Sequence, residues 1–245
     1  SLVMFFTLSC AWNHNYPLVM TPPSPPPLPW LDEHDPLPSP LQAWGEASPA
    51  PGLLAAGGEL SVARLKQAYG QGTFPWFSAG QPILWWCTNP RMVLQTASFR
   101  LHRSLRQAVK KFRDHPRAEI RFDSDFHAVI HACAQSPRPG QHGTWIVPAM
   151  VQAYEALHQA GHAHSVETWI DGELAGGLYC VAIGRAVFGE SMFTRVPDAS
   201  KVALAGLVAL CRAHGVPRID CQQNTRHLAS LGAREIPREE FIAGV

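Results

Sequence analysis

The amino-acid sequence predicts an α+β fold, in which helices pack on a mostly antiparallel β-sheet. Apolar residues recur at helical spacing in one segment, at Leu105, Val109 and Phe112. Two other segments, His164–Ile170 and Leu174–Val181, are predicted as β-strands because they flank the pair Asp171-Gly172, which is typical of a hairpin turn. Helices therefore come before a meander of strands, and a further helix, strand and helix follow.

Composition limits the kind of protein this is. The chain has 245 residues, of which 46% are hydrophobic and 16% charged, enough for a sizeable core. A net charge of +1 gives the whole chain no general attraction to nucleic acid or to membranes. The six cysteines form no CxxC pair and lie mostly in apolar runs, which favours core thiols in a reducing compartment. They are Cys10, Cys87, Cys133, Cys180, Cys211 and Cys221. We expect no disulfide framework, no metal site and no cofactor.

The first third of the chain divides into two predicted parts. Residues 1–30 end in the proline run Pro22–Pro29 and are expected to form an extended or disordered lead-in. The apolar patch Leu2–Leu8 has no basic residue before it and is too short to span a bilayer, so no signal peptide or membrane helix is predicted. Residues 31–96 are predicted to form a small α+β domain, with a helix capped by Ser61.

A concentrated basic element opens the remaining part, residues 97–245, which is predicted to be the larger domain. Between Arg100 and Arg121 eight basic residues accompany two acids, a charge of +6, so the rest of the chain carries +1 − 6 = −5. The basic residues are Arg100, Arg103, Arg106, Lys110, Lys111, Arg113, Arg117 and Arg121. A helix over Arg103–Arg113 would place several of them on one face, either an ordinary solvated face or a surface that binds a polyanion.

The later elements follow from apolar spacing and from turn residues. A helix is predicted through Phe126–Cys133, and another starts near Pro148 and stops at Gly161. Strands are predicted over His164–Ile170, Leu174–Val181, Ala186–Phe193 and Ile219–Gln222, and helices over Ala199–His214 and Thr225–Leu231.

Two of these strands carry acids among apolar residues. Glu190 lies in one strand, and Asp220 lies two residues before Gln222 in another. Since side chains alternate along a strand, Asp220 and Gln222 are predicted on the same face, where a carboxylate and an amide would suit an attacking amine. The alternative is that both acids are ion-pair partners in the core.

Many segments resemble one family, the leucyl/phenylalanyl-tRNA–protein transferases, and they occur in one order from about residue 30 to residue 241. These segments are Gly52–Ser61, Phe74–Phe77, Pro82–Trp86, Gly143–Ile146, Ala153–Tyr154, Gly161–Glu167, Gly176–Tyr179, Gly189–Arg195, Asp198–Lys201, Ile219–Gln222 and Ser230–Arg238. The resemblance implies that the larger domain has an acetyltransferase-like (GNAT-type) fold. It also implies that Leu, Phe or Met is moved from aminoacyl-tRNA to an N-terminal Arg or Lys, which marks the protein for N-end rule degradation. A cytoplasmic enzyme is expected, with a monomer as the default and no membrane partner.

The resemblance also implies roles for individual residues. Gln222 would contact the attacking amine, with Asp220 as base or electrostatic anchor, while Glu190 and Tyr154 would meet the cationic acceptor peptide. The donor side chain and terminal adenosine would be bound by Trp76, Trp145, Tyr69, Leu178, Val187 and Ile219. The phosphates of the tRNA would lie against Arg103, Arg106, Lys110 and Lys111.

Two other functions compete with this interpretation. An acyl-CoA-dependent N-acetyltransferase needs glycine-rich backbone amides for the pyrophosphate, but the segment Arg195–Ser200 has no glycine and contains an acid. A non-catalytic RNA-binding module would explain the basic helix and the tryptophans. It would leave Glu190, Asp220 and Gln222 without a role.

Overall fold

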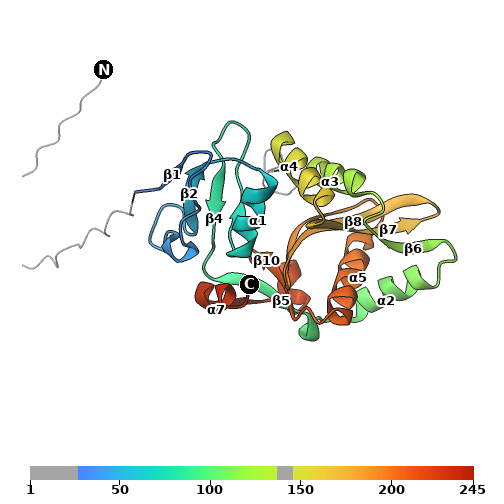
Figure 1. The fold of residues 1–245 in the computed structure, drawn as a ribbon. Helices are drawn as coiled ribbons and strands as arrows, with labels where there is room; N and C mark the ends of the chain where they lie inside the picture. Colours follow the sequence, from blue (N-terminus) through green and yellow to red (C-terminus); the bar gives the residue numbers. More distant parts are fainter. Residues whose placement is uncertain (1–26, 137–145) are drawn as a thin grey trace, which may run out of the picture.

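The computed structural model describes residues 27–136 and 146–245, which form two mixed sheets with helices around them (Figure 1). The predicted α+β class is confirmed at this level. The smaller sheet has the strand order β1-β2-β4-β3, and the larger has the order β11-β5-β10-β9-β8-β7-β6. The strands of the smaller sheet are β1 Trp30–Leu31, β2 Leu53–Gly57, β3 Phe74–Pro75 and β4 Leu84–Trp86.

The larger sheet is mostly antiparallel, as predicted, with one parallel pair. Its strands are β5 Arg91–Gln95, β6 Ala118–Phe122, β7 Ala163–Ile170, β8 Glu173–Ile183, β9 Ala186–Thr194, β10 Arg218–Gln222 and β11 Arg234–Ile236. The parallel pair is β9 and β10, and helix α5 (Ala199–Ala213) connects them. Such a pair needs a crossover connection, because the chain must return to the starting edge before the second strand begins. The hairpin predicted at Asp171-Gly172 joins β7 to β8, with both residues at positive φ.

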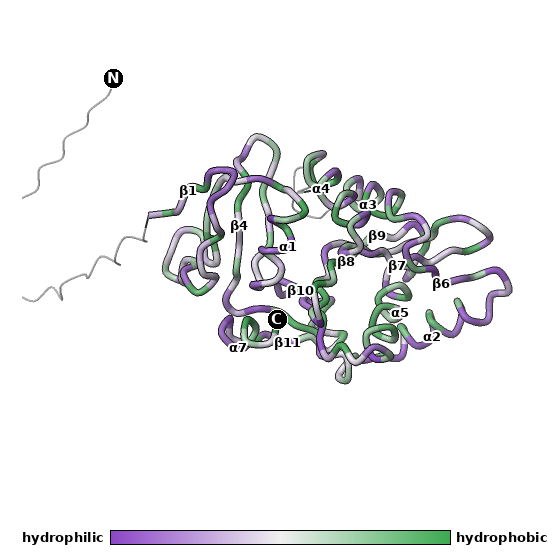
Figure 2. Tube along the Cα trace, viewed as in Figure 1, coloured by the Kyte–Doolittle hydropathy of each residue, from purple (hydrophilic) through white to green (hydrophobic). Residues whose placement is uncertain are grey.

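Helices cover both faces of the larger sheet. In Figure 1, α3 and α4 lie on one face, while α5 and α2 lie on the other. Figure 2 shows α5 mainly in the colours of hydrophobic residues, as expected for a helix packed between the sheet and α2. The helices are α1 Val62–Gly70, α2 Arg103–Arg113, α3 Phe126–Gln135, α4 Pro148–Gln159, α5 Ala199–Ala213, α6 Arg226–Ser230 and α7 Arg238–Ile242, with short 3-10 turns η1 Pro40–Gln42 and η2 Thr96–Ser98.

The sequence predicts α1 to α6 to within a few residues of their observed ends. The side chain of Ser61 caps α1 as expected, because its hydroxyl accepts a hydrogen bond from the Arg64 amide at 3.1 Å. Neither β5 nor β6 is predicted from the sequence. Helix α5 lies so close to β8 that a Cβ on Gly176 would come within 2.7 Å of the Ala199 Cβ.

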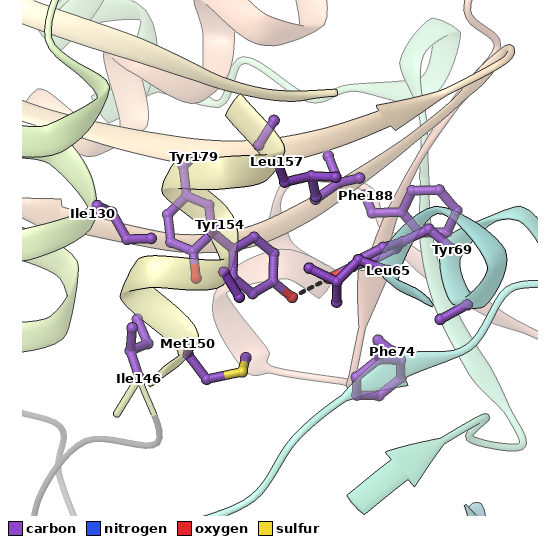
Figure 3. Packing of buried hydrophobic residues seen from close by; sticks show 14 of the residues in the cluster. Leu65, Tyr69, Phe74, Ile130, Ile146, Met150, Tyr154, Leu157, Tyr179 and Phe188 are labelled. Carbon is purple, nitrogen blue, oxygen red and sulfur yellow. Dashed lines mark hydrogen bonds between the residues drawn. The ribbon is translucent and has the colours of Figure 1, made fainter. Parts of the chain in front are cut away.

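The two sheets share a hydrophobic core. Buried residues of α1 pack with buried residues of α4 and of the larger sheet, and Tyr69, Tyr154, Tyr179 and Phe188 meet in this cluster (Figure 3).

The change from the smaller to the larger sheet falls between β4 and β5, and the division of the chain at residue 96 stays a prediction. In the parts that the structure describes, no helix is both long and apolar enough to cross a membrane.

Candidate active site

The candidate site lies where the two parallel strands separate. Strands β9 and β10 pair only through Val187 with Ile219 and Phe188 with Asp220. The next residues of both strands line a cavity of about 400 Å³ instead of pairing with each other. At this point β10 has an irregular register, and Gln222 adopts a positive φ of 59°. The separation of the strands therefore opens the cavity at the centre of the larger sheet.

Most of the cavity wall is apolar. Side chains from β8, β9, β10, α5 and α6 contribute to it, and they include Leu178, Met192, Leu204, Leu207, Ile219 and Leu228. Predicted positions Leu178 and Ile219 are thus at the cavity. Val187 is not among the residues that line it and packs in the adjoining core, so its contact with the donor side chain stays a prediction. The wall suits an apolar side chain of the size of Leu, Met or Phe.

Glu190 supplies the acid of this cavity. Its Oε1 accepts hydrogen bonds from the Tyr69 hydroxyl at 2.7 Å and from Gln222 Nε2 at 3.0 Å. Its Oε2 is buried and has no hydrogen-bond partner among the described residues. Burial raises the pKa of Glu190 to about 7, and the hydrogen bond from Tyr69 opposes part of that rise. One carboxylate oxygen is therefore held in place by two hydrogen bonds, and the other has none from the described residues.

Two tyrosines stand behind Glu190. Tyr69 on α1 and Tyr154 on α4 are fully buried, and their hydroxyls form a hydrogen bond that Figure 3 marks. Burial and the neighbouring Glu190 raise the pKa of both phenols, so both are neutral donors at pH 7. Neither residue is among those that line the cavity, so the contacts of Tyr69 with adenosine and of Tyr154 with the acceptor peptide stay predictions. Tyr154 therefore contacts Tyr69, and Tyr69 in turn donates to the Glu190 carboxylate.

The alternation of side chains predicts that Asp220 and Gln222 face the cavity together. In the structure Gln222 lines the cavity and Asp220 does not. The Arg91 side chain donates two hydrogen bonds to the Asp220 carboxylate, from Nε at 2.8 Å and from Nη2 at 2.6 Å. The backbone N–H of Gln222 donates a third, at 2.9 Å. The pair is buried, with 0% of Arg91 and 2% of Asp220 exposed. The irregular register between Asp220 and Gln222 breaks the alternation and turns the two side chains apart. The alternative of an ion pair in the core holds for Asp220.

Arg91, the partner of Asp220, was not predicted from the sequence. Its guanidinium lies between two aromatic rings, 4.7 Å from the centroid of Phe74 and 4.4 Å from that of Phe241. Phe74 in turn lines the cavity. A buried aspartate needs a cationic partner, so the sequence does imply that one exists, but no spacing rule identifies the arginine 129 residues away.

The predicted aromatic platform is present in part. Trp76 lines the cavity and is half-buried, with its ring 5.4 Å from that of Trp86. Trp145 lies outside the described residues. Two polar residues of the cavity wall, Thr225 and His227, were not predicted. Burial lowers the pKa of His227, and Lys201 and His102 add to this effect.

The basic helix forms as predicted and is exposed. Arg103, Arg106, Lys110 and Lys111 all point to solvent from α2, which is anchored by the buried Leu105. Lys110 forms an ion pair with Asp114, so the charges are partly balanced at the end of the helix. Helix α2 packs on α5, which contributes Leu204 and Leu207 to the cavity wall. Helix α5 therefore lies between the basic surface of α2 and the cavity.

The chain is similar to known proteins over most of its length. Residues 93–245 match the family model described as "Leucyl/phenylalanyl-tRNA protein transferase", and residues 58–89 match that of its N-terminal domain. A protein of Albidiferax ferrireducens named leucyl/phenylalanyl-tRNA–protein transferase is 65% identical over 221 residues, which are 90% of this chain and 87% of that protein. Proteins of the same name from Polaromonas sp. and Burkholderia pseudomallei are 63% and 56% identical, each over 89% of this chain and 86% of the relative.

Solved structures resemble the chain more distantly. The crystal structure of FemX has a TM-score of 0.42 and 11% sequence identity, over 65% of this chain and 59% of that one. A likeness of this size carries no argument about the fold or the site.

Proposed function

Because the chain belongs to the leucyl/phenylalanyl-tRNA–protein transferase family and is an aminoacyltransferase, we propose that it moves Leu, Phe or Met from aminoacyl-tRNA to an N-terminal Arg or Lys of a protein. The protein would then be marked for degradation by the N-end rule. One observation carries the proposal: Glu190 and Gln222 line a mostly apolar cavity, and the side-chain amide of Gln222 donates to the Glu190 carboxylate at 3.0 Å.

The donor end of the cavity accounts for the proposed amino acids. An apolar pocket distinguishes side chains by only about 1–3 kcal/mol per methylene, so one pocket accepts Leu, Met and Phe together. Leu178, Met192 and Ile219 would contact the donor side chain. Trp76 at the same cavity, together with Trp145, would stack on the terminal adenosine of the tRNA.

The reaction needs an amine in its neutral form, a nearby ester and a place for one proton. The amine nitrogen attacks the carbonyl carbon, a new C–N bond forms, and the bond from that carbon to the ribose oxygen breaks. We assign the proton transfer to Glu190, because its pKa of about 7 suits a base that gives up the proton again to the leaving ribose oxygen. Since Gln222 Nε2 already donates to Glu190, the Gln222 side-chain oxygen is the atom that would accept from the amine.

This proposal changes the role first expected of Asp220. Both of its carboxylate oxygens receive hydrogen bonds from Arg91, and the Gln222 amide donates to one of them as well. A carboxylate committed in this way is a poor proton acceptor. Asp220 would instead fix the backbone at Gln222, and through it the direction of the Gln222 side chain, which makes it a positioning residue.

The acceptor preference has an electrostatic basis. Glu190 is the only Asp or Glu among the described residues that line the cavity. A buried carboxylate without a cation is unfavourable, so an acceptor that brings positive charge gains more at this position than a neutral one. An N-terminal Arg or Lys supplies that charge.

The tRNA would lie along α2. Exposed Arg103, Arg106 and Lys111, with Lys110 near the helix end, offer cations to backbone phosphates without reading sequence. Each phosphate contact adds to the salt dependence of binding, with a slope of about 0.7–0.9 per contact in log K against log salt. Weakened binding in the Arg103→Ala variant, with a shallower salt slope, would support this placement.

We also infer the finer properties of the protein. An acetyltransferase-like fold for the larger domain is supported by the parallel strands β9 and β10 that separate at the cavity. Acyl-CoA as donor is disfavoured, because α5 begins at Ala199 directly after Asp198 and the segment that leads into it lacks the glycine-rich amides that a pyrophosphate needs. We propose a monomeric enzyme of the cytoplasm.

The test is a transfer assay with radiolabelled leucyl-tRNA. Three peptides that differ only in the first residue, Arg, Lys or Ala, serve as acceptors, and acetyl-CoA replaces the tRNA in a parallel reaction. We expect label on the Arg and Lys peptides alone and no acetylation. Label on the Ala peptide at the same rate would refute the acceptor rule, and acetylation would favour the CoA-dependent alternative.

A further inference from the structure

Two histidines and a glutamate from neighbouring helices meet at the surface, away from the residues that line the cavity. His127 and His131 lie one turn apart on α3, on the face opposite to the buried Val129 and Ile130. Spacing of four residues places two helical side chains side by side. Glu155 reaches the same point from α4, which packs against α3.

The three ligand atoms are close enough to share one ion. His127 Nδ1 lies 2.6 Å from Glu155 Oε1, and His131 Nε2 lies 3.4 Å from the same oxygen. All three atoms lie within 4.8 Å of one another. Tetrahedral Zn²⁺ with bonds of about 2.0–2.1 Å to nitrogen and oxygen holds its ligand atoms roughly 3.3 Å apart. The His131–Glu155 distance already has this value, and a small rotation of the carboxylate brings His127 to it.

The cluster is open to solvent and includes one carboxylate, whose negative charge favours a bound cation. The side chains are 73%, 43% and 27% exposed for His127, His131 and Glu155, so an ion can enter and keep water as its remaining ligands. Among the described residues, the close contacts of the Glu155 carboxylate with basic side chains are with these two imidazoles. Two neutral imidazoles and one carboxylate would leave a bound divalent ion with one positive charge.

We propose that His127, His131 and Glu155 form a binding site for a first-row divalent transition metal, with Zn²⁺ as its ligand. Two nitrogens and one oxygen suit zinc and its neighbours, whereas Mg²⁺ and Ca²⁺ prefer sites built from oxygen. The ion bridges α3 and α4. Since α4 also carries Tyr154, whose hydroxyl supports Tyr69 and Glu190, the bridge fixes the helix behind the candidate active site.

The test measures Zn²⁺ binding to untagged protein by titration calorimetry. His127→Ala and His131→Ala each remove a ligand at an exposed position, where the fold tolerates the change, and Glu155→Gln keeps the shape of the third. His34→Ala removes an exposed histidine from a turn far along the chain and serves as the control. Circular dichroism establishes that each variant is folded. The visible absorption of bound Co²⁺ reports the coordination geometry.

We expect one saturable Zn²⁺ site in the parent protein and in His34→Ala. Each ligand variant should lose at least about tenfold in affinity, which is the lower end of the loss seen even for residues that only support metal ligands. Bound Zn²⁺ should also raise the melting temperature of the parent and not of His131→Ala, because an ion that binds only the folded state stabilises it. Unchanged affinity in all three variants, or binding only at millimolar metal, would overturn the proposal and leave a surface hydrogen-bonded cluster.

Discussion

Arg91→Met tests whether the buried ion pair is structural. The substitution removes two hydrogen bonds to Asp220, of 2.8 and 2.6 Å, and leaves a carboxylate that is 2% exposed with only the Gln222 amide as donor. Loss of one partner from a buried pair costs about 3–5 kcal/mol, chiefly because the remaining charge is uncompensated. For a chain of this size each kcal/mol corresponds to about 2–4 °C, so the melting temperature should fall by roughly 6–20 °C.

The double variant Arg91→Met/Asp220→Asn separates stability from chemistry. It removes both charges, and the Asn side-chain oxygen can still accept from the Gln222 amide. Neutral replacements of a buried pair are often tolerated, so its free energy of unfolding should lie above that of either single variant. Since we assign Asp220 a positioning role, most of the transfer rate should return as well.

The assay is urea unfolding of the four proteins, followed by transfer from leucyl-tRNA at a temperature where all are folded. A loss below about 1 kcal/mol in Arg91→Met would refute the structural account, since a buried unpaired charge cannot be that harmless. Stability that returns without transfer would show that the Asp220 carboxylate takes part in the reaction.

Three further predictions concern packing, stacking and pH. Gly176→Ala should destabilise by about 1–3 kcal/mol in urea unfolding, because its Cβ would lie 2.7 Å from that of Ala199, whereas Gly45→Ala, with no atom within 4 Å, should be neutral. Trp76→Ala should weaken binding of an aminoacyl-adenosine by about 1–3 kcal/mol in calorimetry, and unchanged affinity would place the base elsewhere. The hydrogen bond to Asp123 raises the pKa of His164, so this pair contributes stability below about pH 6.5 that is lost as the pH rises through the folded-state pKa. In urea unfolding, His164→Ala should therefore destabilise the protein more at about pH 6 than at about pH 9. An equal effect at both pH values would contradict a stabilising His164–Asp123 pair.

The regular elements were predictable because their patterns are local. Helix α2 follows from apolar spacing, and the β7–β8 hairpin follows from Asp171-Gly172. Strand β6 was not predicted, although Ala118, Ile120 and Phe122 alternate with the charged Glu119 and Arg121. It is a short edge strand in which Ile120 and Phe122 remain exposed, and its charged residues were counted as part of the basic span that begins at Arg100.

Only some residues of the candidate site, and little of its geometry, were predictable from the sequence. Glu190 and Gln222 meet as expected, but alternation along a regular strand could not anticipate the irregular register between Asp220 and Gln222, where Gln222 has a positive φ and Asp220 pairs with Arg91. The contact of Tyr69 with Tyr154 joins residues 85 positions apart, and no local pattern reports it. The proposed metal ligands have the same character, since the spacing of the two histidines on α3 is visible in the sequence and their approach to α4 is not.

The role of Glu190 is tested most directly by the pH dependence of single-turnover transfer in the parent protein and in Glu190→Gln. The Gln side-chain oxygen can still accept from Tyr69 and Gln222, so the change removes the proton acceptor and little else. The acceptor amine, with a pKa of about 7.7–8.0, titrates in both proteins, so only the difference between the two profiles reports on Glu190. We predict that the transfer rate of the parent falls more steeply below about pH 7 than protonation of the amine alone explains, because Glu190 becomes protonated as well. Glu190→Gln should be slower by about 10²–10⁴-fold, and its rate should follow the ionisation of the amine alone. A variant with the parent's rate and the parent's profile would contradict the assignment of Glu190 as the base.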